Sequence, residues 1–207
     1  MKDDFLDGDL PKIVVFDLDY TLWPACISCW SDVNVSPPVR AGKTRDHVVD
    51  RSGEKIGFFK DVARVISALK ARGVLVGAAS RTDAISTAKS MLRLIEIDNK
   101  PAMDHFDAVQ IYPGSKLTHF SRIRTDTEIP YHEMLFFDDE SRNKEVEYEL
   151  GVKFMFVQDG VTWDLFRRGI EEWRVHRQEY QSGAKKPRKL QRLKGFGNGY
   201  GDMMSFE

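Results

Sequence analysis

The segment Lys12-Ile13-Val14-Val15-Phe16 is followed directly by Asp17-Leu18-Asp19-Tyr20-Thr21-Leu22. The first of these is an apolar, mostly β-branched run, which is typical of a strand covered on both faces. Four further runs predict strands of the same kind, at 74–79, 134–137, 153–157 and, more weakly, 107–112. The sequence therefore predicts a sheet whose strands lie in the interior.

Helical periodicity fills the intervals between these runs. Val62, Val65, Ile66 and Leu69 have the i, i+3, i+4, i+7 spacing and predict a helix that ends near Gly73. Further helices are predicted over 85–95, 117–123 and roughly 162–180. The alternation predicts an α/β fold, a Rossmann-like parallel sheet with helices on both faces, with ligands bound beyond the carboxyl ends of the strands.

Two segments interrupt the alternation. Residues 23–57 lack helical periodicity, and their length indicates a flap and not a large cap domain. A hairpin is expected at the end of this flap, with arms at 47–50 and 55–56 and with Ser52-Gly53 in the turn. Residues 181–207 are basic and then glycine-rich, and they are predicted to be a disordered tail after a domain that spans 1–180.

Composition excludes several classes of protein. The chain has 207 residues, enough for one domain and too few for two, and 42% of them are hydrophobic. The tail carries +4 and residues 1–180 carry −5, so nucleic-acid binding is disfavoured. We expect no membrane span and no signal peptide, because no long apolar run is present and the chain begins Met1-Lys2-Asp3-Asp4. Two cysteines exclude a disulfide scaffold and favour a cytoplasmic location, with the nucleus as a second possibility.

Acidic residues follow two of the predicted strands. Asp17 and Asp19 come after the first strand, where buried carboxylates need a partner such as Mg²⁺, a cation that prefers oxygen ligands and also binds phosphate. One of the two can attack phosphorus and the other can transfer protons. Asp138 and Asp139 follow the strand at 134–137 and can complete the cation site. The alternatives are an Asx-type turn at Asp17 and an acidic helix cap at Asp138.

Phosphate-binding candidates follow the other strands. Ser80 stands where a strand passes into a helix, and the guanidinium of Arg81 suits bidentate contact with phosphate. Lys116 opens a short helix, where its charge opposes the helix dipole unless it faces anions. Taken singly, Ser80 is readily explained as a helix cap and Lys116 as a solvated surface lysine. Four such signals, each at a strand end or the helix start beyond it, favour one phosphate site.

The sequence resembles the haloacid dehalogenase superfamily of phosphotransferases, and in particular its small eukaryotic magnesium-dependent phosphatases. The resemblance extends from about Pro11 to Tyr180. It is carried by four motifs, namely Phe16-Asp17-Leu18-Asp19-Tyr20-Thr21-Leu22-Trp23-Pro24, Ala79-Ser80-Arg81-Thr82, Ile111-Tyr112-Pro113-Gly114-Ser115-Lys116 with Thr118-His119-Phe120, and Phe136-Phe137-Asp138-Asp139-Glu140 with Arg142-Asn143.

The resemblance implies a role for each motif residue. Asp17 is expected to be the nucleophile that forms an aspartyl-phosphate, and Asp19 the general acid and base. The expected ligands of Mg²⁺ are Asp17, the main-chain carbonyl of Asp19 and Asp139. Supporting roles are implied for Ser80 and Lys116 as phosphate-binding residues, Arg81 as a substrate contact, Thr21 in orienting the nucleophile loop and Asp138 behind the metal ligands.

A magnesium-dependent phosphomonoesterase is the function that the resemblance implies. An acid at the Asp19 position suits protonation of an alkoxide leaving group and disfavours a dehalogenase. The substrates that the family suggests are phosphotyrosine in proteins, sugar phosphates and phosphorylated fructosamine adducts on proteins. We expect the protein to be a monomer. The alternatives are a phosphomutase and a non-catalytic module that binds a phosphorylated ligand.

Three features outside the motifs leave alternatives open. Cys26 and Cys29 form one C-x-x-C pair, for which ordinary flap cysteines are favoured over a zinc or redox site. Trp23 and Trp30 stand in the flap, where an exposed ring can hold a substrate and half-buried packing is equally consistent. For His119 a structural role is favoured over a catalytic one.

Overall fold

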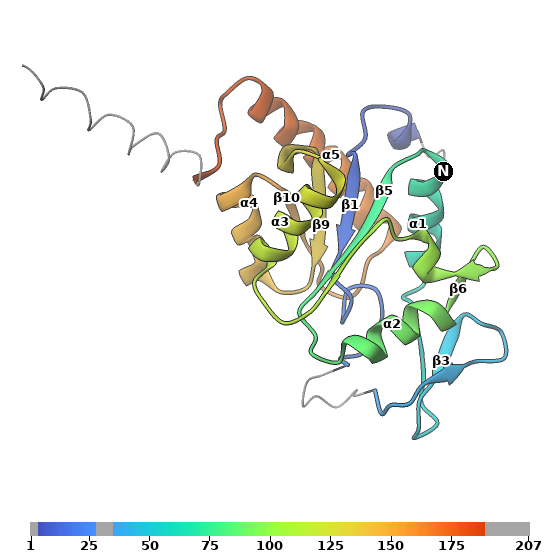
Figure 1. Ribbon diagram of the computed structural model, residues 1–207. Coiled ribbons are helices and arrows are strands. Elements are labelled where there is room, and N and C mark those ends of the chain that lie inside the picture. The colour runs from blue at the N-terminus through green and yellow to red at the C-terminus, as the bar shows by residue number, and fades with distance from the viewer. Residues whose placement is uncertain (1–3, 28–34, 189–207) are drawn as a thin grey trace, which may run out of the picture.

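The central element of the computed structural model is a five-stranded parallel sheet (Figure 1). The model describes residues 4–27 and 35–188. The strands are β1 (Ile13–Phe16), β5 (Leu75–Ser80), β8 (Ala108–Ile111), β9 (Met134–Asp138) and β10 (Lys153–Phe156), in the order β10-β9-β1-β5-β8. The predicted α/β class and all five predicted strands are confirmed.

Helices on both faces explain why the strands are apolar throughout. Val14 and Phe16 belong to one core with α1 (Val62–Ala71) and α5 (Trp163–Gln181). Ile13 and Val15 face the opposite way, into a second core with α3 (Lys116–Thr127) and α4 (Glu145–Leu150). All four β1 side chains are fully buried, so neither face requires polar residues.

Helix α2 (Ile85–Leu94) is confirmed as a helix, but its position differs from that of the helices that cover the two faces of the sheet. It packs against strand β3 (His47–Val49) and the short 3₁₀ helix η2 (Ala102–His105), and in Figure 1 it lies below the sheet beside β3. Ala88, Met91 and Leu92 are the buried side of α2 and belong to the same core as Phe16. The helix therefore joins the carboxyl edge of the sheet to the flap.

The flap is described over residues 23–27 and 35–57, and its second part contains a three-stranded antiparallel sheet. Its strands are β2 (Arg40–Ala41), β3 (His47–Val49) and β4 (Lys55–Gly57). The predicted hairpin is confirmed, since Val48 pairs with Ile56 and Gly53 takes a left-handed φ of 93° in the turn. Val48 and Ile56 are buried in the main core, so this part of the flap is fixed to the body.

Several short elements lie outside the predicted pattern. They are the hairpin of β6 (Glu96–Ile97) and β7 (Lys100–Pro101) and the 3₁₀ helices η1 (Asp4–Leu6), η2 (Ala102–His105), η3 (Tyr131–Glu133) and η4 (Ser141–Lys144). In the parts of the chain that the structure describes, none of the helices has the length and apolar character needed to cross a bilayer. Residues 189–207 of the predicted tail lie outside the described residues, and its disorder stays a prediction.

Candidate active site

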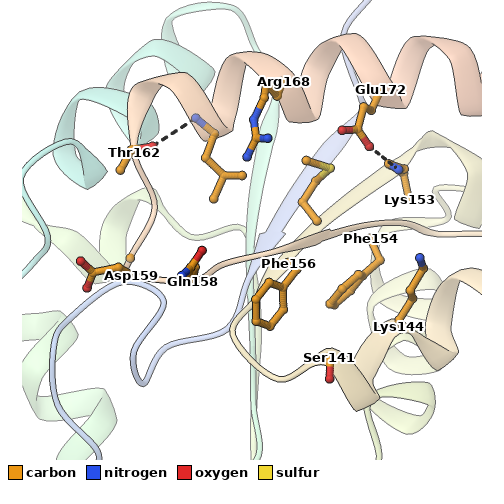
Figure 2. Close-up of a pocket in the computed structure, with 13 residues that line it drawn as sticks. Ser141, Lys144, Lys153, Phe154, Phe156, Gln158, Asp159, Thr162, Arg168 and Glu172 are labelled. Atoms are coloured by element: carbon orange, nitrogen blue, oxygen red, sulfur yellow. Dashed lines mark hydrogen bonds and ion pairs between the residues drawn. The ribbon is translucent and has the colours of Figure 1, made fainter.

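Two cavities lie near the carboxyl end of β9. One of about 730 Å³ runs beside β10, between α5 and η4 (Figure 2). Its charged residues include Lys153, which forms an ion pair of 2.7 Å with Glu172. None of the residues expected to be functional lines it. They gather instead around a smaller cavity of about 300 Å³. That cavity is lined by Asp17, Asp19, Tyr20, Cys26, Ser80, Arg81, Thr82, Asp139, Glu140 and Arg142.

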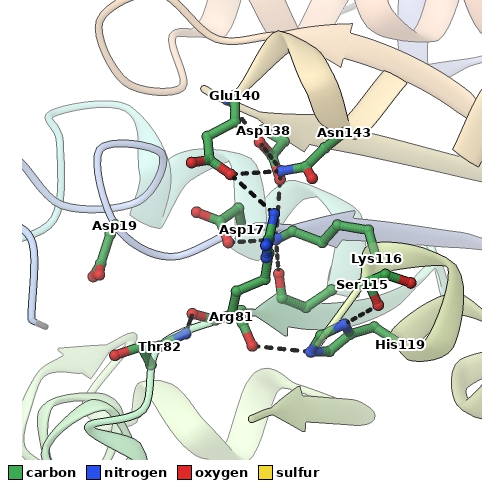
Figure 3. A network of polar contacts seen from close by, with 12 residues as sticks. Asp17, Asp19, Arg81, Thr82, Ser115, Lys116, His119, Asp138, Glu140 and Asn143 are labelled. Atoms are coloured by element: carbon green, nitrogen blue, oxygen red, sulfur yellow. Dashed lines mark hydrogen bonds and ion pairs between the residues drawn. The ribbon is translucent and has the colours of Figure 1, made fainter. Parts of the chain in front are cut away.

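Lys116 lies beneath this cavity and joins two strand ends (Figure 3). Its Nζ atom lies 2.6 Å from Oδ1 of Asp17 and 3.0 Å from Oδ2 of Asp138, and it also donates to the carbonyl of Ala79. Only 1% of the Lys116 side chain is exposed, so the interpretation as a solvated surface lysine is wrong. Burial disfavours the ammonium form, but the two carboxylates outweigh this cost and raise the pKa of Lys116.

The Asp17 carboxylate is buried directly after β1. Burial raises its pKa to about 8, and the charges of Asp138 and Asp19 act in the same direction against the opposing effect of Lys116. An Asx-type turn does not explain this residue, because its side chain accepts from the ammonium of Lys116. A cation in the cavity would favour the ionised form of Asp17.

Asp138 is fully buried and its carboxylate is fully engaged. Asn143 Nδ2 donates to both of its oxygens at 2.9 Å, and the Glu140 amide donates to Oδ1 at 2.7 Å. The residue at the cap position of η4 is the acidic Glu140, without a side-chain cap hydrogen bond, and that of α4 is Lys144, so Asp138 itself is not a helix cap. Asp138 holds Lys116 from behind.

Asp139 lines the cavity itself. Burial raises its pKa to about 6, and the neighbouring charges of Asp138 and Glu140 add to the effect. A bound cation would stabilise the ionised form of this half-buried carboxylate against its two acidic neighbours.

The Asp19 side chain is held on the flap side of the cavity. Trp23 Nε1 donates to Oδ1 at 2.8 Å and the Ile27 amide donates to Oδ2 at 3.1 Å. Burial raises the pKa of Asp19 despite these two hydrogen bonds. Trp23 is completely buried and stacks on Phe58, with 6.0 Å between the ring centroids, so an exposed ring that holds substrate is wrong for this residue.

Ser80 and Thr82 form the wall opposite Asp138. The Thr82 amide donates to Oγ of Ser80 at 3.3 Å, and only 2% of Ser80 is exposed. Ala84 is the cap residue of α2, so the interpretation of Ser80 as a helix cap is wrong. Thr21 lies behind the nucleophile loop, with its carbonyl accepting from the Val161 amide at 3.0 Å and its buried hydroxyl without a partner among the described residues.

His119 links three backbone segments around the site. Its Nδ1 lies 2.7 Å from the Ser115 carbonyl, and its Nε2 lies 3.0 Å from that of Ser80 and 2.9 Å from that of Tyr112. The ring also stacks on Tyr112 at 4.3 Å. Burial lowers the pKa of His119, and the nearby Lys116 ammonium acts in the same direction, against the three carbonyls. His119 fixes the start of α3, and hence Lys116, against the ends of β5 and β8.

Glu140 connects two arginines at the mouth of the cavity. Arg142 donates to both of its carboxylate oxygens, with Nε 3.0 Å from Oε2, and Arg81 Nη1 lies 3.7 Å from Oε2. Asn143 Nδ2 also donates to Oε2, at 3.1 Å. Of these residues only Arg81 was expected from the sequence to contact substrate. The others follow the acidic pair without a distinct spacing that indicates a function.

The oxygen atoms around the cavity suit a Mg²⁺ ion. Among the residues that the structure describes, no group of three or more His, Cys, Asp and Glu side chains is placed to hold a metal. The Asp19 carboxylate is engaged by Trp23 and Ile27. The remaining donors are the carboxylates of Asp17 and Asp139 and the Asp19 carbonyl. Mg²⁺ is commonly held by one or two carboxylates, with waters and substrate phosphate completing its shell, so this set fits.

Cys29 and Trp30 lie outside the described residues. Cys26 is described and is disulfide-bonded, so the preference for two ordinary flap cysteines is not confirmed, and a zinc or redox role stays open.

Comparisons with known proteins relate the whole domain to phosphatases. The family model described as Acid Phosphatase matches residues 9–176. Magnesium-dependent phosphatase 1 of Homo sapiens is 41% identical over 163 residues, which cover 78% of this chain and 86% of that protein. A HAD-like hydrolase superfamily protein of Schizosaccharomyces pombe is 43% identical over 152 residues, 71% of this chain and 86% of that protein.

A solved structure supports the fold. The N-terminal part of a Bacteroides fragilis protein, which contains a phosphatase domain and was crystallised with Mg, matches with a TM-score of 0.51. It is 19% identical, and the match covers 83% of this chain and 41% of that chain. The similarity supports the α/β architecture alone.

Proposed function

This chain belongs to the acid phosphatase family, and from that premise we propose that it is a Mg²⁺-dependent phosphomonoesterase that works through an aspartyl-phosphate on Asp17. The expected resemblance to the magnesium-dependent phosphatases of the haloacid dehalogenase superfamily is confirmed by the relatives. The observation that carries the proposal is the buried ammonium of Lys116, 2.6 Å from Asp17 and 3.0 Å from Asp138.

The cofactor is Mg²⁺, held by Asp17, Asp139 and the carbonyl of Asp19. When bound, it supplies positive charge that offsets the repulsion between a phosphate dianion and the carboxylates. Lys116 adds to this charge from below, and its ammonium also separates Asp17 from Asp138. Ser80 binds a phosphate oxygen from the opposite wall, and Arg81 contacts the substrate.

The first step transfers the phosphoryl group to the protein. An oxygen of the Asp17 carboxylate attacks phosphorus while the bond from phosphorus to the ester oxygen breaks. Protonated Asp19 gives its proton to that oxygen, so an alcohol leaves. The raised pKa of Asp19, caused by burial, supports this role, because it favours the protonated form that a general acid needs.

The second step releases phosphate. The Asp19 carboxylate takes a proton from water, and the water oxygen attacks phosphorus. The bond from phosphorus to Asp17 breaks, which restores both aspartates and yields inorganic phosphate. Thr21 keeps the nucleophile loop in place through the hydrogen bond between its carbonyl and the Val161 amide.

The flap, of which residues 23–27 and 35–57 are described, supports an uncapped catalytic domain over residues 1–180. An open site admits large substrates, so phosphotyrosine proteins and phosphorylated fructosamine adducts are proposed together with sugar phosphates. A cytoplasmic location, with the nucleus as a second possibility, is part of the proposal, and we favour a monomer. Transfer to a sugar hydroxyl faster than to water would indicate the alternative, a phosphomutase.

Removal of the metal tests the proposal. We expect the wild-type protein to hydrolyse p-nitrophenyl phosphate with Mg²⁺ and to lose that activity in EDTA, because the remaining carboxylates repel the phosphate dianion. Addition of excess Mg²⁺ to the EDTA-treated protein should restore the rate, measured as release of p-nitrophenolate. Phosphate binding without turnover under all conditions would instead indicate a non-catalytic binding module.

Trp23→Phe tests the role of the hydrogen bond to Asp19. Phenylalanine keeps an aromatic ring beside Phe58 but removes the donor, so the general acid loses its orientation. We expect kcat to fall on the order of tenfold, part of the 10²–10⁴ that general acid-base catalysis contributes, with KM unchanged. Phe58→Leu is the control, since it removes the stacking partner and leaves the hydrogen bond. Equal losses of kcat in both variants would mean that packing alone matters.

A further inference from the structure

The mouth of the catalytic cavity holds two guanidinium groups and one carboxylate between them. Arg81 follows β5 and Arg142 lies on η4 after β9, so they approach from different elements. Both contact Glu140, and all three side chains line the cavity. Their exposed fractions are 36%, 65% and 40% for Arg81, Arg142 and Glu140, so a ligand can reach them.

The other carboxylates of the cavity have their own partners. Asp17 is paired with Lys116, and Asp19 accepts from Trp23 and Ile27. Asp139 is assigned to Mg²⁺ in the proposed function. Within the described residues, Glu140 is thus the carboxylate that forms ion pairs with both arginines, so two guanidinium charges share one carboxylate.

The contact between Arg142 and Glu140 shows what this site can bind. The Nε and Nη2 atoms of Arg142 meet the two oxygens of one carboxylate, a planar bidentate pairing. Arg81 is turned toward the same carboxylate at 3.7 Å. The guanidinium group of Arg142 is therefore already oriented to bind a carboxylate on a ligand, beside the position where phosphate is expected.

We propose that Arg81 and Arg142 select phosphomonoesters that carry a carboxylate on the leaving group, and that Glu140 occupies the carboxylate position until the substrate arrives. This inference rests on the proposed phosphatase function and defines the substrate class of the same site. Arg142 is assigned as a specificity-determining residue. Glu140 competes with the substrate's carboxylate, since both are acceptors for the same guanidinium groups.

The test compares pairs of substrates that differ in one charge. The ortho, meta and para carboxyphenyl phosphates are each assayed against the carbamoylphenyl phosphate of the same geometry, and the ratio of kcat/KM for acid over amide is taken. Comparing this ratio between variants cancels the intrinsic reactivity of each leaving group. For at least one isomer we expect Arg142→Gln to lower it about tenfold, a loss expected for a charge-assisted bidentate pair.

Glu140→Gln separates this role from a simple surface ion pair. It removes the competing charge, so the ratio should rise, whereas a pair that only supports the loop would change kcat/KM for acid and amide alike and leave the ratio unchanged in both variants. The control is Arg122→Ala, an exposed arginine on α3 that lines another cavity, which should leave the ratio unchanged. The preference in the wild type should weaken from 50 to 500 mM salt, because exposed charges are screened.

Ratios that stay within twofold for every isomer in both variants would overturn the inference while leaving the phosphatase function intact. Absence of hydrolysis of every ester would instead overturn the proposed function. In that case the affinities for carboxyphenyl and carbamoylphenyl phosphonates, measured by titration calorimetry in the same variants, still decide whether the mouth prefers a carboxylate.

Discussion

Asp17→Asn should reduce kcat for p-nitrophenyl phosphate by about 10⁴-fold or more, the scale seen when an essential catalytic group is removed. The amide that replaces the carboxylate is not a nucleophile and carries no charge for Mg²⁺. The protein should nevertheless fold, because asparagine has the same shape and its side-chain oxygen can still accept from Lys116. The free energy of unfolding should stay within about 1 kcal/mol of the wild-type value.

The measurement pairs initial rates with urea denaturation of the same preparations. Asp7→Asn is the matched control, since Asp7 is 74% exposed, pairs with Arg72 and precedes the amino end of β1. It should retain full activity. Asp17→Asn protein that is folded and keeps more than a tenth of the activity would contradict the assignment of the nucleophile.

Lys116→Met should lower both activity and stability. It leaves Asp17 and Asp138 buried without their cation, and breaking a buried ion pair in this way costs about 3–5 kcal/mol. For a chain of this size the melting temperature should fall by roughly 10 °C. Hydrolysis should be lost at the same time, because the positive charge beneath the phosphate is gone.

A double variant distinguishes charge from packing in this second case. Lys116→Met combined with Asp138→Asn removes one of the two carboxylates that have lost their cation. The double variant should therefore be more stable than Lys116→Met alone. Lys70→Met is the control, because Lys70 pairs with Asp107 at 2.8 Å but is 31% exposed, and exposed pairs contribute about 0–1 kcal/mol. If the double variant is less stable than Lys116→Met, the loss comes from the packing of the lysine stem.

The sheet could be predicted because two features of the sequence mark its strands. Burial on both faces makes each strand apolar throughout, and function places acids, Ser80 or Lys116 beyond the ends. The position of α2 was not predictable in the same way. Its apolar residues have ordinary helical spacing, and the periodicity does not reveal whether the buried side faces the sheet or the flap.

The candidate site was predictable in its composition but not in its second layer of contacts. Trp23 lies four residues after Asp19, and only the turn between them brings the indole to the carboxylate. That turn includes Tyr20 with a φ of 53°, a left-handed conformation that an aromatic residue seldom adopts. The ion pairs of Glu140 with Arg81 and Arg142 depend on loops from two different strands, which no local pattern records.

The shared core of flap and sheet has a kinetic consequence. Because Val48 and Ile56 are buried with the side chains of β1, a swing of residues 35–57 away from the body would expose that core. This part of the flap therefore differs from a hinged lid that opens and closes in each turnover. The mouth of the catalytic cavity has its final shape before a substrate binds. Discrimination among substrates therefore depends on fixed shape and charge and not on induced closure.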